Sequence, residues 1–187
     1  SGEALAGDKK TGFDFDFISR VCDTVNKCTA MGAEVGIVVG GGNFWRGVKD
    51  GAGHVERVSA DRMGMLATAM NCLAFADVLR QCGGDAKVLT AMDIQGVGER
   101  YSTDKAVEYL KSGKVVMFGC GTGCPFFSTD TAAVLRAAEI GADAILLAKN
   151  IDGVYSADPR LDPAAVKYDS ISYDEVLAQH LAVMDST

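Results

Sequence analysis

Apolar residues follow two different patterns along the chain, and the two patterns alternate. Four short runs are mostly apolar without alternation, as strands buried on both faces of a parallel sheet are, and they cover residues 35–39, 87–91, 114–118 and 144–148. Other stretches repeat their apolar residues at helical spacing, and they cover residues 17–31, 59–82, 102–113, 131–140 and 174–181. Strands that alternate with helices indicate βαβ units. We therefore predict an α/β fold, a three-layer α/β/α sandwich around a mainly parallel sheet.

The helix predicted at residues 59–82 is apolar around nearly its whole circumference. We expect Ser59 or Asp61 near its N-terminal cap. A helix of this kind is either deep in the core or shared with another subunit, and in a chain of this size we favour a homodimer contact. The 187 residues show no repeat, no low-complexity tract and no dividing linker, so we predict a single domain that covers residues 1–187.

Two glycine-rich turns follow predicted strands directly, at residues 40–42 and 119–123. Glycine lacks the Cβ atom that would keep a ligand away, and the first N–H groups of a following helix have no partner within that helix. In open α/β sheets, ligands bind at the carboxyl ends of the strands. We therefore favour phosphate-facing turns over flexible loops, with one of residues 128–130 as the N-cap of the helix after the second turn.

Charge and cysteine usage narrow the class of protein. The chain carries 18 basic and 25 acidic residues, a net charge of −7, which argues against a nucleic-acid-binding face and against binding to an anionic membrane. The longest weakly polar run, residues 63–76, is too short to span a bilayer, and the first residues show no signal-peptide pattern. The six cysteines form no CxxC pair. We expect reduced thiols rather than disulfides or metal ligands, in a cytoplasmic protein.

The motifs exclude several kinds of chemistry. The sequence contains no GxSxG nucleophile elbow, no Walker A pattern and no GxGxxG dinucleotide fingerprint. What remains is a set of loops at strand ends that are rich in Gly, Thr and Asp and carry one arginine, Arg46. Phosphoryl transfer suits this inventory, because it depends on positioning and charge neutralisation more than on a covalent nucleophile. The residues alone therefore indicate a phosphate- or nucleotide-binding α/β enzyme.

Five distinctive segments follow one another along the whole chain. They are residues 1–5 (SGEAL), 39–47 (VGGGNFWRG), 61–68 (DRMGMLAT), 121–130 (GTGCPFFSTD) and 152–159 (DGVYSADP). Together they resemble the bacterial UMP kinases, or uridylate kinases, of the amino-acid-kinase superfamily. The segments at 61–68 and 121–127 distinguish UMP kinases from carbamate, acetylglutamate, aspartate and glutamate kinases.

The resemblance implies the reaction UMP + ATP → UDP + ADP in pyrimidine nucleotide biosynthesis, with ATP as phosphoryl donor and Mg²⁺ as its companion. It assigns catalytic roles to Arg46, Asp130 and Asp185. It assigns UMP binding to Gly41, Arg46, Asp61, Thr122, Gly123, Cys124, Pro125, Phe126, Phe127, Ser128 and Thr129. It assigns ATP binding to Ser1, Gly2, Gly42, Arg46, Asn150, Tyr155 and Asp158, and it gives Asp130 and Asp185 the task of organising basic groups or magnesium. It also implies a homohexamer built from dimers, with GTP or UTP as effectors.

The chain departs from the family pattern in two ways. In this family a strand that ends in a catalytic lysine precedes the segment at residues 1–5, and a further helix and strands follow the segment at 184–185. The sequence contains neither part, so we expect a piece of a longer protein, truncated at both ends, and we expect residues 1–187 alone to be inactive. In addition, Cys124 replaces an asparagine of the family, which removes an amide from the nucleotide loop.

Two alternatives stay open. One is another phosphotransferase of the same superfamily that acts on a carboxylate or a carbamate. The other is a regulator without catalytic activity that binds UMP or UTP with the same fold.

Overall fold

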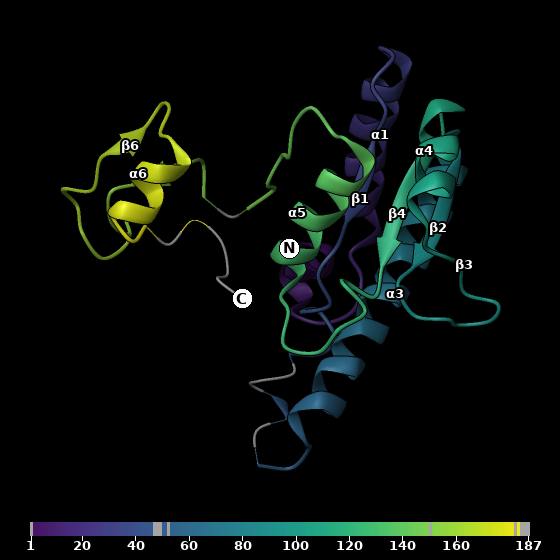
Figure 1. The fold of residues 1–187 in the computed structure, drawn as a ribbon, viewed down its shortest axis with the longest axis horizontal. Coiled ribbons are helices and arrows are strands. Elements are labelled where there is room, and N and C mark those ends of the chain that lie inside the picture. The colour runs from purple at the N-terminus through teal and green to yellow at the C-terminus, as the bar shows by residue number, and fades with distance from the viewer. Residues whose placement is uncertain (1, 47–49, 52, 150, 182, 184–187) are drawn as a thin grey trace. The chain divides into compact units, whose positions relative to one another are not determined.

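The computed structural model describes residues 2–46, 50–51, 53–149, 151–181 and 183. These residues form two compact units, the first of which ends at Ile145, while the second begins at Leu146 (Figure 1). The single domain expected from the sequence stays a prediction. The first unit contains the sheet and most of the helices, and the second is a small unit with a hairpin and one helix.

The sheet of the first unit has four strands, all parallel, in the order β1-β4-β2-β3. The strands are β1 (Gly36–Val38), β2 (Ala86–Thr90), β3 (Glu99–Arg100) and β4 (Val115–Gly119). Three of them confirm strands expected from their consecutive apolar residues. The two-residue β3 lies outside the predicted strands, because a strand this short leaves no pattern. All five residues of the central strand β4 are buried.

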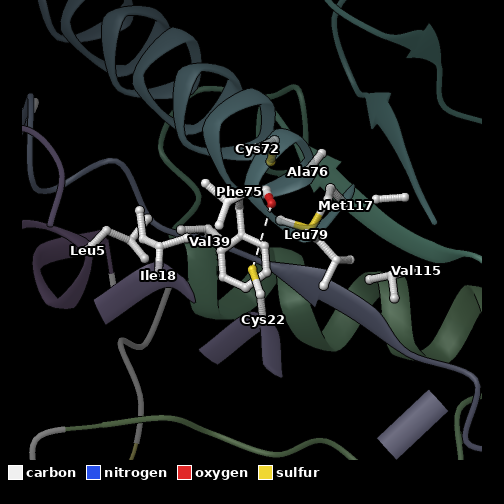
Figure 2. Packing of buried hydrophobic residues seen from close by; sticks show 12 residues of the cluster. Leu5, Ile18, Cys22, Val39, Cys72, Phe75, Ala76, Leu79, Val115 and Met117 are labelled. Carbon is white, nitrogen blue, oxygen red and sulfur yellow. Dashed lines mark hydrogen bonds between the residues drawn. The ribbon is translucent and has the colours of Figure 1, made fainter. Parts of the chain in front are cut away.

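Helices cover both faces of this sheet, which confirms the three-layer architecture (Figure 1). They are α1 (Phe15–Ala30) and α3 (Arg57–Gln81) on one face, and α4 (Thr103–Lys111) and α5 (Thr129–Ile140) on the other. Successive residues of β4 point to opposite faces, as strand geometry requires. Figure 2 shows Met117 among Cys22, Phe75 and Leu79 of α1 and α3. Phe118 lies in the opposite cluster with Leu110 of α4.

Side chains at the helix ends explain where most helices begin. The hydroxyl of Ser102 caps α4, and the hydroxyl of Ser128 accepts from Thr131 N–H at 3.1 Å and caps α5. Helix α3 begins earlier than we expected, with Glu56 at its N-cap. Ser59 and Asp61, which we expected near the cap, therefore lie within the first two turns of the helix, and neither is its N-cap residue. The carboxylate of Asp61 is bound instead by Arg57 and by a loop distant in sequence.

Two regions differ from their sequence patterns. The N-terminal residues form a 3₁₀ segment, η1 (Gly2–Lys9), where we predicted no regular element. Residues 144–148, expected as a strand, belong to no strand of the described residues, and Leu146 is 91% exposed. A strand needs a neighbour for its backbone hydrogen bonds, so its apolar pattern is not sufficient by itself.

The second unit contains an antiparallel pair, β5 (Val154–Tyr155) and β6 (Lys167–Tyr168), followed by α6 (Tyr173–Ala178). The helix confirms the helical pattern at residues 174–181, although it is shorter than predicted. Ser172 and Glu175 form a capping box at its start. No helix of the described residues is long and apolar enough to cross a bilayer.

Candidate functional site

Two loops meet at the carboxyl edge of the sheet. The β1 loop (residues 39–46) follows β1, and the β4 loop (residues 120–128) joins β4 to α5. Because β1 and β4 are parallel neighbours, both loops leave the same edge. A Cβ atom placed on Gly40 would lie 3.9 Å from the hydroxyl oxygen of Thr129, the first residue of α5. The two glycine turns that we predicted to face phosphate therefore lie next to each other.

The β1 loop is confined between the N-terminal segment and helix α3. A Cβ atom on Gly2 would overlap the Gly40 carbonyl oxygen and lie 2.9 Å from Gly42 N. A Cβ atom on Gly41 would lie 2.8 Å from the carbonyl oxygen of Gly64 in α3. Backbones approach this closely only where side chains are absent. The structure thus brings together the predicted site residues Gly2, Gly41 and Gly42.

Arg46 closes the β1 loop and lies beside its glycines. Its Nε lies 3.5 Å from the position of a Cβ atom on Gly42, and its guanidinium forms an ion pair with Glu3. The arginine side chain is 46% exposed, so it remains accessible to a ligand. Sequence reasoning did not single out Glu3, although it lies beside the predicted residues Gly42 and Arg46. The ion pair with the Glu3 carboxylate orients the Arg46 side chain.

A buried amide pair holds the β1 loop from below. Asn43 and Asn71 exchange two hydrogen bonds, of 2.9 and 2.7 Å, and both side chains are almost fully buried. Asn71 also donates to the Gly40 carbonyl oxygen at 2.6 Å, and Asn43 donates to the Gly12 carbonyl oxygen at 2.9 Å. Sequence reasoning missed both residues. An amide at position 71, within an otherwise apolar helix, was the available signal.

The β4 loop has an unusual backbone. Cys120 and Phe126 have positive φ angles of 64° and 73°, and Gly121 and Gly123 have φ angles of 58° and 81°. A residue with a side chain in this region costs about 1–2 kcal/mol, and such residues cluster at functional sites. The hydroxyl of Thr122 accepts from Cys124 N–H at 3.1 Å and braces the turn. The loop is therefore held in a conformation that its sequence alone does not favour.

Asp61 ties helix α3 to the β4 loop. Its Oδ2 accepts a 2.8 Å hydrogen bond from Phe126 N–H. The Nε of Arg57, one turn earlier in α3, lies 2.9 Å from both carboxylate oxygens. The guanidinium of Arg57 also lies 5.1 Å from the centre of the Phe126 ring. Two predicted site residues thus contact each other, and sequence reasoning missed Arg57, which connects them.

The remaining predicted residues of the β4 loop line its outer side or the start of α5. Phe126 and Phe127 are 55% and 54% exposed, and Cys124 is exposed. Pro125, Ser128 and Asp130 are partly buried, the last in the first turn of α5. The structure places all of them on one loop and one helix start.

Several predicted residues lie elsewhere. Ser1, Asn150 and Asp185 lie outside the described residues. Tyr155 and Asp158 belong to the second unit. Hydrogen bonds from Lys167 and then from Tyr155, both of 2.8 Å, hold the pKa of the Asp152 carboxyl below its usual value. These contacts favour a structural role for Asp152.

A cavity of about 510 Å³ lies away from both loops, between α1 and the C-terminal half of α3. Its lining residues are Phe15, Ser19, Ala74, Asp77, Val78, Gln81 and Cys82. It shares no residue with the β1 and β4 loops. We place the candidate site at the loops, because backbone donors, hydroxyl groups and an arginine converge there, whereas the cavity has no such set.

The loops together provide what an anionic ligand needs. They offer glycine backbone that a ligand can approach, hydroxyl groups at a helix start, and one accessible guanidinium. Asp61 adds a carboxylate that retains acceptor capacity beyond its two protein partners, since an ionised carboxylate offers about four acceptor positions. The arrangement can bind a phosphorylated ligand and neutralise charge on it.

Comparison with known proteins agrees with this assignment. Residues 1–186 match the sequence model of the amino acid kinase family. The chain is similar to the crystal structure of a UMP kinase from Bacillus anthracis, with a TM-score of 0.93 and 36% identity over 98% of this chain and 76% of that one. A UMP kinase from Ureaplasma parvum gives a TM-score of 0.93 and 35% identity over 99% and 79% of the two chains. A uridylate kinase from Archaeoglobus fulgidus gives 0.68 and 29% over 95% and 73%. The chain belongs to the amino acid kinase family.

Proposed function

We propose that the protein is a UMP kinase, which transfers the γ-phosphoryl group of ATP to UMP in pyrimidine nucleotide biosynthesis. The observation that carries the proposal is the Asp61–Phe126 hydrogen bond, which joins α3 to the β4 loop beside the glycines and Arg46 of the β1 loop. The segments that meet there are those that resemble UMP kinases. The similarity to solved UMP kinases at 36% and 35% identity supports the same assignment.

In this proposal the β4 loop binds UMP. Residues 122–129 surround the nucleotide with backbone N–H groups and hydroxyls, while Gly41 and Asp61 contact it from the β1 loop and from α3. Arg46 faces the phosphates of both substrates, for which a forked guanidinium is suited. Gly2 and Gly42 lie next to Arg46 and its partner Glu3, on the side that we assign to the phosphates of ATP. Asn150, Tyr155 and Asp158 are assigned to the adenosine, Ser1 to the loop that binds the phosphates of ATP, and Asp185 to a catalytic role.

The proposal includes Mg²⁺, bound together with the phosphates of ATP. Within the described part of the chain, no three His, Cys, Asp or Glu side chains gather as a metal cage. Magnesium does not require one, because it keeps several waters and binds through one or two carboxylates and the substrate phosphates. Asp130, in the first turn of α5, fits this need and would hold it. The ion supplies neutralisation of phosphate charge.

The test is a kinase assay on full-length protein with UMP, CMP and AMP as acceptors. We expect UMP to be strongly preferred. Arg46→Ala should lower kcat by roughly 10²–10³-fold, as loss of a group that stabilises transition-state charge does. Arg20→Ala, on the exposed side of α1, is the matched control and should leave kcat unchanged. Equal turnover of CMP contradicts the acceptor assignment, and turnover of a carboxylate or carbamate without UMP favours the alternative phosphotransferase. Tight UTP binding without any turnover favours the regulator.

We also propose that α3 forms a homodimer contact, within a homohexamer built from dimers. Four apolar side chains of α3 recur at coiled-coil spacing and are 37–46% exposed: Met63, Leu66, Met70 and Leu73. Light scattering on the full-length protein should give six times the chain mass. Leu66→Glu should dissociate the dimer, whereas Met31→Glu, at an exposed position after α1, should not. A monomer at micromolar concentration would rule the contact out.

The resemblance further suggests a cytoplasmic enzyme with GTP or UTP as effectors, and we include both in the proposal. Initial rates measured with each effector at fixed UMP and ATP test the second point, and cell fractionation tests the first. Rates that do not change with either nucleotide would remove the effectors from the proposal.

A further inference from the structure

Arg136 is a buried charge close to the β4 loop. Arg136 is only 5% exposed, although its guanidinium is always ionised. The guanidinium carbon lies 3.9 Å from the centre of the Tyr101 ring, and Nη1 pairs with Glu139. Nη2 donates to the carbonyl oxygen of Gly121 at 3.3 Å. The arginine on α5 therefore joins the residues after β3 to the first turn of the β4 loop.

The partners of Arg136 fix its orientation. Glu139 accepts from Tyr101 hydroxyl at 2.6 Å as well as from Arg136, so a triad holds the guanidinium plane. Burial raises the pKa of Glu139, but hydrogen bonds from Tyr101 and Arg136 and the arginine charge outweigh it, so the pKa lies below its usual value. Glu139 is thus ionised at neutral pH. A buried charge is costly unless it is paired in this way, and the pairing leaves one side of the fork for the loop.

The contact with Gly121 sets the direction of the next peptide. A trans peptide is planar, and its C=O and N–H groups point in opposite directions. When Arg136 binds the Gly121 carbonyl, the N–H of Thr122 in the same peptide points away from Arg136. The following N–H, of Gly123, already donates to the Cys120 carbonyl at 2.9 Å. Among the described residues Thr122 N–H has no acceptor, so it is a donor that this turn leaves open to a ligand.

We propose that Arg136 is a positioning residue for the acceptor nucleotide. It acts through the Gly121 carbonyl and holds Thr122 N–H in the direction in which it donates to an oxygen of a nucleoside monophosphate. The inference rests on the proposed function and deepens it, because it explains how a glycine turn without intrinsic rigidity keeps one orientation. Tyr101 and Glu139 support the same task by holding the guanidinium.

The decisive variant is Arg136→Lys in the full-length protein. Lysine keeps the charge but cannot bind Glu139 and Gly121 with one rigid fork. We expect the KM for UMP to rise about 10-fold, the effect of losing a charged hydrogen bond, while the KM for ATP and kcat stay within about twofold. Glu139→Gln should raise the UMP KM in the same direction but less. Glu108→Gln, at an exposed position of α4, is its control and should change nothing.

A stability-matched control variant distinguishes a positioning role of Arg136 from a purely structural one. Ile18→Val, in the core between α1 and α3, is expected to lower the thermal midpoint without touching the β4 loop. If Arg136→Lys lowers the midpoint but leaves the UMP KM as in Ile18→Val, the inference is wrong. If the wild-type protein itself neither binds nor phosphorylates UMP, the proposed function is what fails. The two failures are therefore told apart by the wild-type rate alone.

Discussion

Asp61 and Phe126 are 65 positions apart in the sequence, and the backbone N–H of Phe126 donates a 2.8 Å hydrogen bond to the Asp61 carboxylate. This bond holds a non-glycine residue at a φ angle of 73°. It therefore fixes the outer half of the β4 loop to helix α3. The acceptor side of the proposed site depends on this one contact more than on any regular element.

Asp61→Ala should loosen the β4 loop and raise the KM for UMP by roughly 10- to 100-fold, because a charged hydrogen bond to the loop and a contact to UMP are lost together. The KM for ATP should change little. Initial rates at varied UMP measure the effect. Asp77→Ala is a matched control, since this exposed acid of α3 also has an arginine partner, Arg80. Equal rises in both KM values would contradict an acceptor-side role.

Asn71→Leu should destabilise the first unit by about 2–4 kcal/mol, because it removes the donor to the buried Asn43 Oδ1 and to the partly buried Gly40 carbonyl oxygen. Urea denaturation followed by circular dichroism measures the change. Thr24→Ala removes a hydroxyl that bonds only within the exposed side of α1, so it should change the free energy of unfolding by less than about 0.5 kcal/mol. A stable Asn71→Leu protein would mean that the loop finds another support.

Two glycines of one region should respond in opposite ways to alanine. Gly41→Ala places a Cβ atom 2.8 Å from the Gly64 carbonyl oxygen, so the β1 loop must shift, and kcat should fall at least about 10-fold. Gly64→Ala has its nearest neighbour at 3.8 Å, and it should stabilise helix α3 by about 0.5–1 kcal/mol. Kinase assays and thermal unfolding of both variants provide the comparison. Loss of activity in Gly64→Ala alone would reverse the assignment.

The apolar pattern predicted β1, β2 and β4 because the signal for each strand lies within its own residues. Each is a mostly apolar run beside a glycine turn. The same local signal predicted a strand at residues 144–148, which join neither of the two sheets that the described residues form. Partners that are distant in sequence carry no such signal. Asp61 resembled a helix cap, because a carboxylate at a helix start has that role by default.

The residues that support the candidate site were missed for the same reason. Asn71 and Arg136 are single polar residues within helical patterns, and their importance comes from the loops that they reach after folding. Glycine loops, in contrast, were evident from composition alone. The sequence thus indicated which loops form the candidate site, whereas the groups that hold these loops in place required the structure.

The buried thiol of Cys72 gives the protein a specific alkaline sensitivity. Burial, with a smaller contribution from Cys120, raises the pKa of Cys72 from 9.0 to about 12. Above pH 9 the unfolded chain loses this proton and the folded chain keeps it, so the free energy of unfolding should fall by up to about 1.4 kcal/mol per pH unit until the folded thiol also ionises. Below pH 9 this contribution is fully present. Urea denaturation at several alkaline pH values measures the slope.

Other groups also titrate in this range, so the informative quantity is the difference in slope between wild type and Cys72→Ala. The variant lacks the thiol, and its stability should decline less steeply from pH 9 upward, whatever its absolute stability. Cys28→Ala removes an exposed thiol and should keep the wild-type slope. If the slopes of wild type and Cys72→Ala coincide, the thiol ionises equally in both states, which would require water to reach the core between α3 and the sheet.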